Sequence, residues 1–202
     1  MKGIFLFDID TQRDLILSAG ALAVPGAQRL IPKLRRLFDF ARTQQITILS
    51  TANAHEPDAA RADGHPGYCV RGTEGQKKID DTLLLHPLIL ENRPVNRNFA
   101  EIIRKHQQVI VEKQDFDPFS NPAAEKLLRV LPPYAVLFGV PAEHSVRLAG
   151  LGLRRLGIRA AVVQNATMAL QPRDAAGSEA VLRAAGVEFT TIEMLLGALS
   201  GL

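Results

Sequence analysis

The chain has 202 residues, of which 47% are hydrophobic and 22% are charged, with a formal net charge of +3 and one cysteine, Cys69. The length fits a single globular domain spanning residues 1–202. The mild charge, without a long basic run, argues against nucleic-acid binding, and no apolar stretch approaches the roughly 18 residues of a membrane span. A lone thiol excludes an internal disulfide and a cysteine-based metal cage. The lone thiol and the absence of a signal-peptide pattern at the N-terminus together favour a cytoplasmic location.

The first quarter of the chain predicts a strand, a helix and a second strand. An apolar run predicts the strand Gly3–Ile9, apolar residues at helical spacing predict the helix Ala27–Gln44, and a second apolar run predicts the strand Ile46–Ser50. Residues Thr51–Gly75 are rich in Ala, Gly, Pro, His and Asp and have no stable period. We expect them to form a long functional loop within the same domain.

The remainder of the chain continues the alternation of strands and helices. The predicted strands are Leu88–Leu90, Val109–Glu112, Tyr134–Val140 and Arg159–Gln164, and the predicted helices are Ala123–Val130, Glu143–Leu156, Ser178–Ala185 and Ile192–Leu199. The strands are nearly continuous apolar runs, which is typical of strands covered on both faces. The sequence therefore predicts an α/β fold with three α/β/α layers around a mostly parallel, Rossmann-like sheet of about five or six strands.

Polar residues follow several of these strands: Asp10, His55, Lys113 and Ser145. In such folds ligands bind beyond the carboxyl ends of the strands. An Asp and a Lys near one hydroxyl or thiol would make a nucleophile, base and cation site. The alternative is that Asp10 and Lys113 form a purely structural ion pair at the sheet edge, and spacing alone leaves both interpretations open.

Common cofactor and nucleophile motifs are absent. The glycines of Gly150–Gly157 have the wrong spacing for a dinucleotide fingerprint and fall within a predicted helix. No phosphate-binding GxxxxGK[ST] loop and no GxSxG nucleophile elbow occurs. We therefore predict no cofactor.

Five short segments occur in order along the chain: Asp10-Thr11-Gln12-Arg13-Asp14, Ser50-Thr51-Ala52-Asn53-Ala54-His55, Tyr68-Cys69-Val70-Arg71-Gly72-Thr73-Glu74-Gly75, Glu112-Lys113, and Gly139-Val140-Pro141-Ala142-Glu143-His144-Ser145-Val146. In type and order they resemble the motifs of the isochorismatase-like cysteine hydrolases, especially the nicotinamidase-related branch. The resemblance covers nearly the whole chain. It implies hydrolysis of a small amide-like C–N bond through an acyl-enzyme, with Asp10 as the base and Lys113 as its supporting cation.

The resemblance also identifies two departures beside the nucleophile. Ser145 stands where the family has its nucleophilic Cys, and a hydroxyl is far less acidic than a thiol, so a serine needs a well-placed base. Pro141 stands where a backbone N–H helps to form the oxyanion hole, and proline has no N–H. The family has a cis peptide at this point, in the turn Val140-Pro141-Ala142, and an X–Pro bond accepts the cis form readily.

A third departure concerns metal binding. Asn53 replaces a metal-binding Asp and Tyr68 replaces a metal-binding His, so that only His55 remains of the ligands that align. A neutral amide and a phenol are poor ligands for a divalent cation. We therefore expect no metal at these positions.

Two functional hypotheses follow. The chain is a silent or strongly impaired homologue, acting as a binding or scaffold module; or it is an active amidohydrolase, either a Cys→Ser variant of the nucleophile or an enzyme that uses Ser145 in an altered mechanism. Cys69 lies outside the nucleophile's position, and we interpret it as a bystander. The resemblance further implies a small amide-like ligand and a homo-oligomer, a dimer or tetramer.

Overall fold

The computed structural model describes residues 3–57 and 67–200. These residues form a parallel sheet of seven strands in the order β3-β4-β2-β1-β5-β6-β7. The strands are β1 (Phe5–Ile9), β2 (Ile48–Asn53), β3 (Leu88–Leu90), β4 (Gln108–Lys113), β5 (Tyr134–Gly139), β6 (Arg159–Thr167) and β7 (Glu188–Thr190). The predicted α/β class is confirmed, but the predicted number of strands, five or six, is wrong because the sheet has seven. The additional strand, β7, is a three-residue edge strand without the apolar run that reveals a buried strand.

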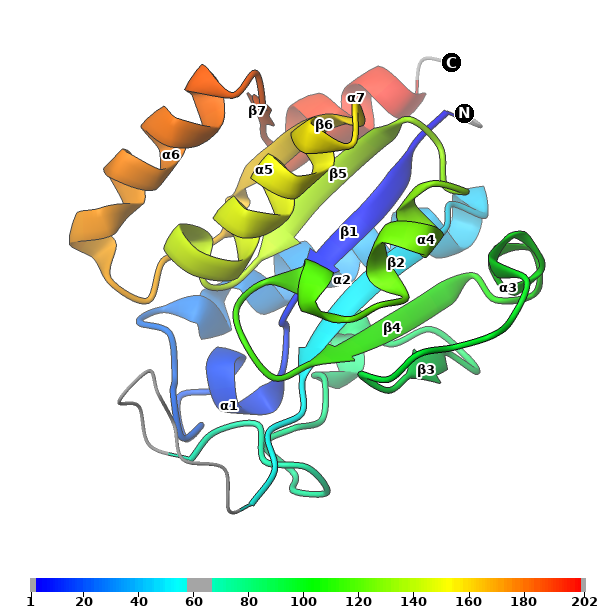
Figure 1. Cartoon of the computed structure of the whole chain (residues 1–202). Coiled ribbons are helices and arrows are strands. Elements are labelled where there is room, and N and C mark those ends of the chain that lie inside the picture. Colours follow the sequence, from blue (N-terminus) through cyan, green and yellow to red (C-terminus); the bar gives the residue numbers. More distant parts are fainter. Residues whose placement is uncertain (1–2, 58–66, 201–202) are drawn as a thin grey trace.

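Helices cover both faces of the sheet (Figure 1). They are α1 (Arg13–Ile16), α2 (Ile31–Gln44), α3 (Phe99–Lys105), α4 (Ala124–Leu128), α5 (Arg147–Arg155), α6 (Ala175–Ala184) and α7 (Ile192–Ser200). In this view α2 and α7 lie behind the sheet, whereas α3, α4, α5 and α6 lie in front of it. This gives the three layers that the alternating pattern predicts.

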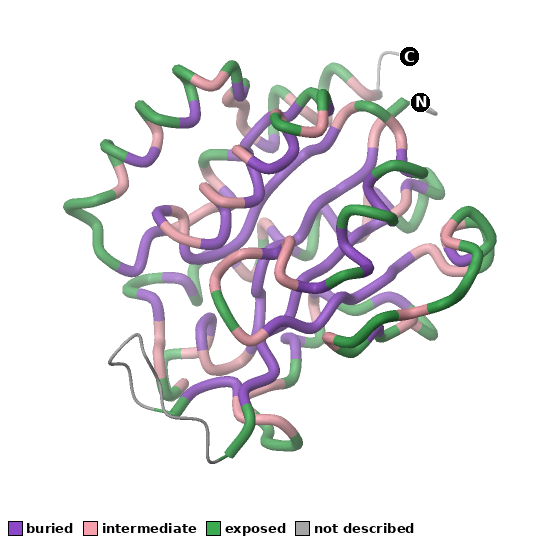
Figure 2. The backbone as a smooth tube through the Cα atoms, in the orientation of Figure 1, coloured by how far each residue is buried: buried purple, intermediate pink, exposed green. Residues whose placement is uncertain are grey.

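The side chains of β1 divide between two apolar cores, one on each side of the sheet. Leu6 packs in the core that includes α2, and Phe5 and Phe7 pack in the core that includes α4 and α5. Successive residues of a strand point to opposite faces, so a strand buried on both sides reads as a continuous apolar run. Figure 2 shows the central strands buried along their length.

The strand order places a topological switch point at β1. From β1 the chain continues to β2 on one side, and β5 later pairs with the other side of β1. In open α/β sheets the crevice at such a point, beyond the carboxyl ends of the strands, is where ligands bind. Residues that follow β1, β2, β4 and β5 are therefore brought to one region.

Two predicted helices begin with irregular turns. The helix predicted from Ala27 opens with the 3₁₀ turn Ala27–Leu30, and the helix predicted from Glu143 opens with the π-helical turn Ala142–Val146. The π turn carries Ser145, and such turns occur frequently at functional sites. Part of the predicted loop Thr51–Gly75, residues 58–66, lies outside the described residues.

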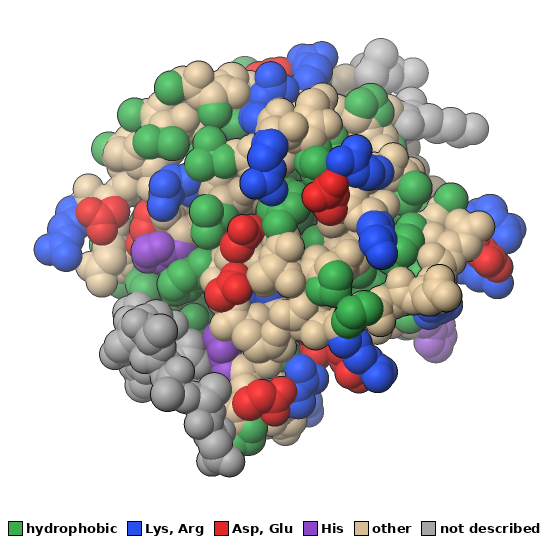
Figure 3. All heavy atoms as spheres, in the orientation of Figure 1, with side chains coloured by type: hydrophobic (Ala, Val, Ile, Leu, Met, Phe, Trp, Pro, Cys, Tyr) green, Lys and Arg blue, Asp and Glu red, His purple; other side chains and the backbone are tan. Residues whose placement is uncertain are grey.

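The surface charge and the helix lengths show two further features. On the face in Figure 3 the positive and negative side chains are interspersed and do not form one basic patch. None of the helices in residues 3–57 and 67–200 is both long and apolar enough to span a membrane.

Candidate active site

A buried ion pair lies where β1 and β4 end. Asp10 follows β1, Lys113 ends β4, and both side chains are fully buried, with Lys113 Nζ 2.8 Å from Asp10 Oδ2. Two charges withdrawn from water in this way stabilise each other only when close and well bonded. The structure therefore brings together the two charged residues that the sequence singled out.

The ammonium of Lys113 has further partners from neighbouring elements. It donates to Asn53 Oδ1 at 2.7 Å and to the backbone oxygen of Asp115 at 2.9 Å. Ser145 Oγ, on the π turn after β5, accepts from the same Nζ at a long 3.5 Å. Ser145 is thus close to the pair, but its hydroxyl contacts a cationic donor, which cannot take up the serine proton.

The carboxylate of Asp10 is positioned by β2 and by its own backbone. Thr51 Oγ1 donates to Asp10 Oδ1 at 2.5 Å, and the Asp10 N–H lies 3.1 Å from the same hydroxyl oxygen. Asp10 has a φ of 50°, in the left-handed region that Asp tolerates better than most residues. Its Oδ2 faces the Lys113 ammonium yet receives no directed hydrogen bond from the described residues. Among the described residues, this buried oxygen is therefore held by the ion pair with Lys113.

The turn before Ser145 provides few backbone donors. The Val140–Pro141 peptide is cis, and Pro141 has no N–H. The N–H of Ala142 is already bonded to the backbone oxygen of Met168 at 2.9 Å. Neither Pro141 nor Ala142 therefore offers an N–H to an oxyanion in this geometry.

Glu143 joins the π turn to the loop after β6. Its carboxylate accepts from the N–H of Leu170 at 3.2 Å and from that of Gln171 at 2.6 Å, and the residue is 3% exposed. These bonds hold the loop after β6 against the π turn. They thereby also hold the Met168 carbonyl, which accepts the N–H of Ala142. Glu143 is a positioning residue of this turn.

The positions that resemble metal ligands do not form a suitable set. Asn53 lies in the site, but its Oδ1 accepts from a cation, and its Nδ2 donates to Gln12 Oε1 at 3.3 Å. The rings of His55 and Tyr68 meet edge to face, with their centroids 4.9 Å apart. An amide oxygen bonded to an ammonium and a phenol do not fit a divalent cation. In the part of the chain that the structure describes, no three His, Cys, Asp or Glu side chains gather into a possible metal site.

Two other residues considered from sequence have clear positions. His144, next to Ser145, stacks on Phe116 with the ring centroids 4.5 Å apart. Cys69 is buried in the loop between β2 and β3, with its N–H donating to Asp14 Oδ2 at 2.6 Å and its Sγ 3.8 Å from the Gly75 carbonyl. Its environment is that of a packed residue of the loop.

Sequence reasoning missed several residues that shape the site. Thr51 was assigned to the predicted loop and Asn53 to a degenerate metal position, although both lie in β2 and bond directly to Asp10 and Lys113. Gln12 binds β2 twice, through Nε2 to the Asn53 carbonyl and through Oε1 to the Asn53 N–H. A hydroxyl or amide at the end of a strand is a weak signal for these roles. Asp115 accepts from Lys113 through its backbone carbonyl, and the residue type does not reveal such a role.

The fold and the strand-end pair define a class of protein: a doubly wound α/β protein with a buried Asp–Lys pair beside a hydroxyl that opens a helix. The isochorismatase domain model matches residues 5–194. The chain belongs to the isochorismatase family. A search of curated proteins found no match.

Solved structures with similar folds include family members and amidases. An isochorismatase family protein from Desulfovibrio vulgaris has a TM-score of 0.76 at 21% identity, covering 99% of this chain and 100% of its own. The pyrazinamidase of Pyrococcus horikoshii, in complex with zinc, has a TM-score of 0.73 at 21% sequence identity, and the match covers 94% of this chain and 99% of that protein. The nicotinamidase of Bacillus subtilis has a TM-score of 0.72 at 18% sequence identity, and the match covers 94% of this chain and 99% of that protein. At these identities the likeness establishes the shared fold.

Proposed function

We propose that the chain is a small-molecule-binding homologue of the amide hydrolases whose own turnover is strongly impaired. The observation that carries this proposal is the turn before Ser145. Pro141 has no N–H, and the N–H of Ala142 is bonded to the Met168 carbonyl. Loss of one oxyanion donor reduces the rate by about 10²–10³-fold in enzymes that form a tetrahedral intermediate.

The nucleophile's position adds a second, independent impairment. A cation near a thiol stabilises the thiolate, and this is how the Lys113 ammonium would activate a cysteine. A serine hydroxyl is far less acidic and needs a base that accepts its proton. The contact of Ser145 with Lys113 Nζ at 3.5 Å supplies a donor to that oxygen and no acceptor for its proton.

A binding role is supported by what the chain retains. The buried Asp10–Lys113 pair and the amide of Asn53 lie at the carboxyl ends of the strands, the edge of the sheet at which this fold class binds ligands. Such groups bond well to the carbonyl and the N–H₂ of a small amide. The pyrazinamidase and nicotinamidase neighbours lead us to choose pyrazinamide and nicotinamide as probes. In line with the family resemblance, we propose a cytoplasmic homo-oligomer without a cofactor or a metal.

Four proteins test the proposal: the natural chain, Ser145→Cys, Pro141→Ala and the double variant, each assayed for ammonia release from nicotinamide, pyrazinamide and benzamide. We expect the double variant to exceed Ser145→Cys by about 10²-fold in kcat, because the alanine restores a backbone N–H. The natural chain should be slowest. Equal rates for the natural chain and the double variant would overturn the proposed impairment, and no turnover by the double variant would refute Ser145 and Pro141 as its cause.

A second candidate is an active hydrolase that uses Ser145 with Asp10 as its base. The observation in its favour is the buried Asp10 Oδ2, which receives no directed hydrogen bond from the described residues. Under this hypothesis the natural chain hydrolyses one of the amides, and Asp10→Asn abolishes that activity. Under the first hypothesis, Asp10→Asn has no natural activity to remove.

A further inference from the structure

A cavity lies on the other face of the sheet from Ser145. Its volume is about 330 Å³, within the range of ligand pockets, and it is bounded by β2, β3, β4 and the segment before β3. Its apolar lining residues are Ala52, Leu83, Pro87, Ile89 and Ile110. The remaining lining residues are Arg13, Gln76, Lys77, Lys78, Asp80 and Glu112.

The cavity is separate from the candidate active site because of strand alternation. Glu112 and Lys113 are consecutive on β4, so their side chains point to opposite faces. Lys113 faces Asp10, whereas Glu112 lines the cavity. Asp10, Lys113 and Ser145 are not among its lining residues.

Lys78 gives the cavity a buried donor. The residue is 4% exposed, and its Nζ lies 2.8 Å from Asp8 Oδ2 and 3.3 Å from the Thr51 carbonyl. An ammonium has three N–H donors, and these are its two polar partners among the described residues. The third N–H has no partner among the described residues, and Lys78 is one of the residues that line the cavity.

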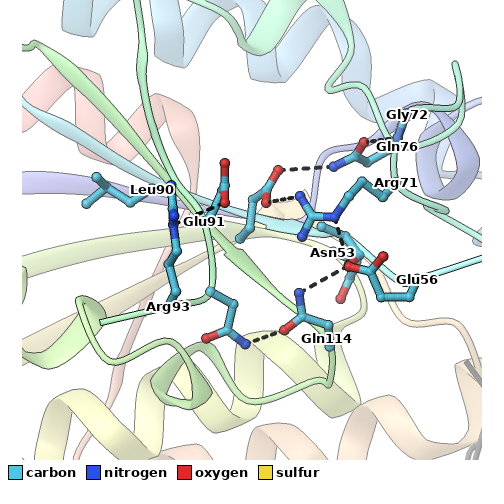
Figure 4. A network of polar contacts seen from close by, with 12 residues as sticks. Asn53, Glu56, Arg71, Gly72, Gln76, Leu90, Glu91, Arg93 and Gln114 are labelled. Atoms are coloured by element: carbon cyan, nitrogen blue, oxygen red, sulfur yellow. Dashed lines mark hydrogen bonds and ion pairs between the residues drawn. The ribbon is translucent and has the colours of Figure 1, made fainter. Parts of the chain in front are cut away.

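The two acidic residues of the lining are already paired. Arg71 and Gln76 donate hydrogen bonds to the carboxylate of Glu112 at 2.8 Å and 3.1 Å, and Figure 4 shows both side chains directed at one carboxylate. Hydrogen bonds to Glu56 and then to Glu112 raise the pKa of Arg71, which keeps this partner charged. Asp80 pairs with Arg13 at 3.1 Å, and Lys77 and Arg13 both pair with Glu74. The unsatisfied capacity of the lining is thus a donor, next to apolar surface.

We propose that this cavity binds a small apolar monocarboxylate, with its carboxylate on the ammonium of Lys78 and its hydrocarbon part on Ala52, Ile89 and Ile110. A charge-assisted hydrogen bond to a buried ammonium supplies the specificity, and burial of the hydrocarbon supplies most of the affinity. The Asp8 carboxylate stays paired with Lys78 at 2.8 Å. The site does not depend on the proposed amide site, since it shares none of its catalytic side chains.

Benzoate is the probe, with benzyl alcohol as its uncharged counterpart, and methyl NMR of the full chain is the readout. We expect benzoate to saturate one site and to shift the methyl signals of Ile89 and Ile110. Benzyl alcohol should bind at least tenfold more weakly. Shifts confined to Val140 and Val146 would place benzoate at the π turn beside Ser145, and they would overturn the proposal, as would equal binding of the two probes.

Two rim variants supply a test that does not disturb the buried pair. Ile89 is 54% exposed and lines the cavity, so Ile89→Glu should fold and place a negative charge at its mouth, while Ile89→Gln controls for size. We expect the glutamate to weaken benzoate binding about fivefold relative to the glutamine. Leu85 is 89% exposed and does not line the cavity, so Leu85→Glu should leave binding unchanged. Equal affinities for Ile89→Glu and Ile89→Gln would refute the site.

Discussion

Replacement of Lys113 by Met tests the buried pair on which the account of the site depends. Lys113 and Asp10 are fully buried and 2.8 Å apart. The substitution leaves the Asp10 carboxylate with Thr51 as its hydrogen-bond donor, and it also removes the bonds to Asn53 Oδ1 and the Asp115 carbonyl. Removal of one member of a buried ion pair costs about 3–5 kcal/mol, so we expect a loss of this size in the free energy of unfolding at neutral pH.

Urea denaturation followed by far-ultraviolet circular dichroism measures this loss. Lys105→Met is the matched control, because Lys105 and its partner Glu101 are largely exposed and an exposed pair contributes little to stability. The double variant Asp10→Asn with Lys113→Met should lose less than the sum of the two single variants, since it removes both charges. A loss below about 1 kcal/mol for Lys113→Met would refute the buried pair.

Three further predictions concern the packing and the titration of the chain. Gly139→Ala should lower the free energy of unfolding by about 3 kcal/mol or more, because φ is +121° and the new Cβ would lie 2.0 Å from a backbone oxygen of β1. Gly177 lies on α6 with open space around it, so Gly177→Ala should raise the free energy of unfolding by about 0.5–1 kcal/mol. Equal effects of the two would contradict the close approach. Burial, and then the hydrogen bond to Glu188, raise the pKa of Tyr134 to about 12, so the stability that it contributes is complete below pH 10 and is lost as the pH rises through 12. Ultraviolet absorbance should show Glu188→Gln moving this titration downward, and an unchanged midpoint would count against the assigned cause. The buried thiol of Cys69 should resist iodoacetamide in the native protein and react in urea, so rapid native labelling would contradict its role as a bystander.

The layers of the fold could be predicted because burial on both faces leaves a mark in the sequence. The apolar runs of β1 and β5 gave strands close to their observed bounds. β7 carries no such run, because an edge strand is covered less and can include charged residues such as Glu188. The helix α3 was missed because only one of its seven residues, Ile102, is buried, so its apolar period is weak.

The candidate site was predictable where function depends on side-chain type, and unpredictable where it depends on backbone geometry. Asp10, Lys113 and Ser145 were named from their places after strands, and they lie together. The Met168 carbonyl that occupies the Ala142 N–H could not be predicted, because a backbone acceptor can belong to any residue. The two hydrogen bonds that Glu143 accepts depend in the same way on where the loop after β6 lies relative to the π turn.

The central claim is that Ser145 is not an activated nucleophile. A fluorophosphonate, which phosphonylates activated serines with release of fluoride, tests it directly when the intact mass of the protein is followed over time. The account predicts no gain in mass for the natural chain, as for a Ser145→Ala control. Stoichiometric labelling of the natural chain that disappears in Ser145→Ala would contradict the account and establish a working serine at the end of β5.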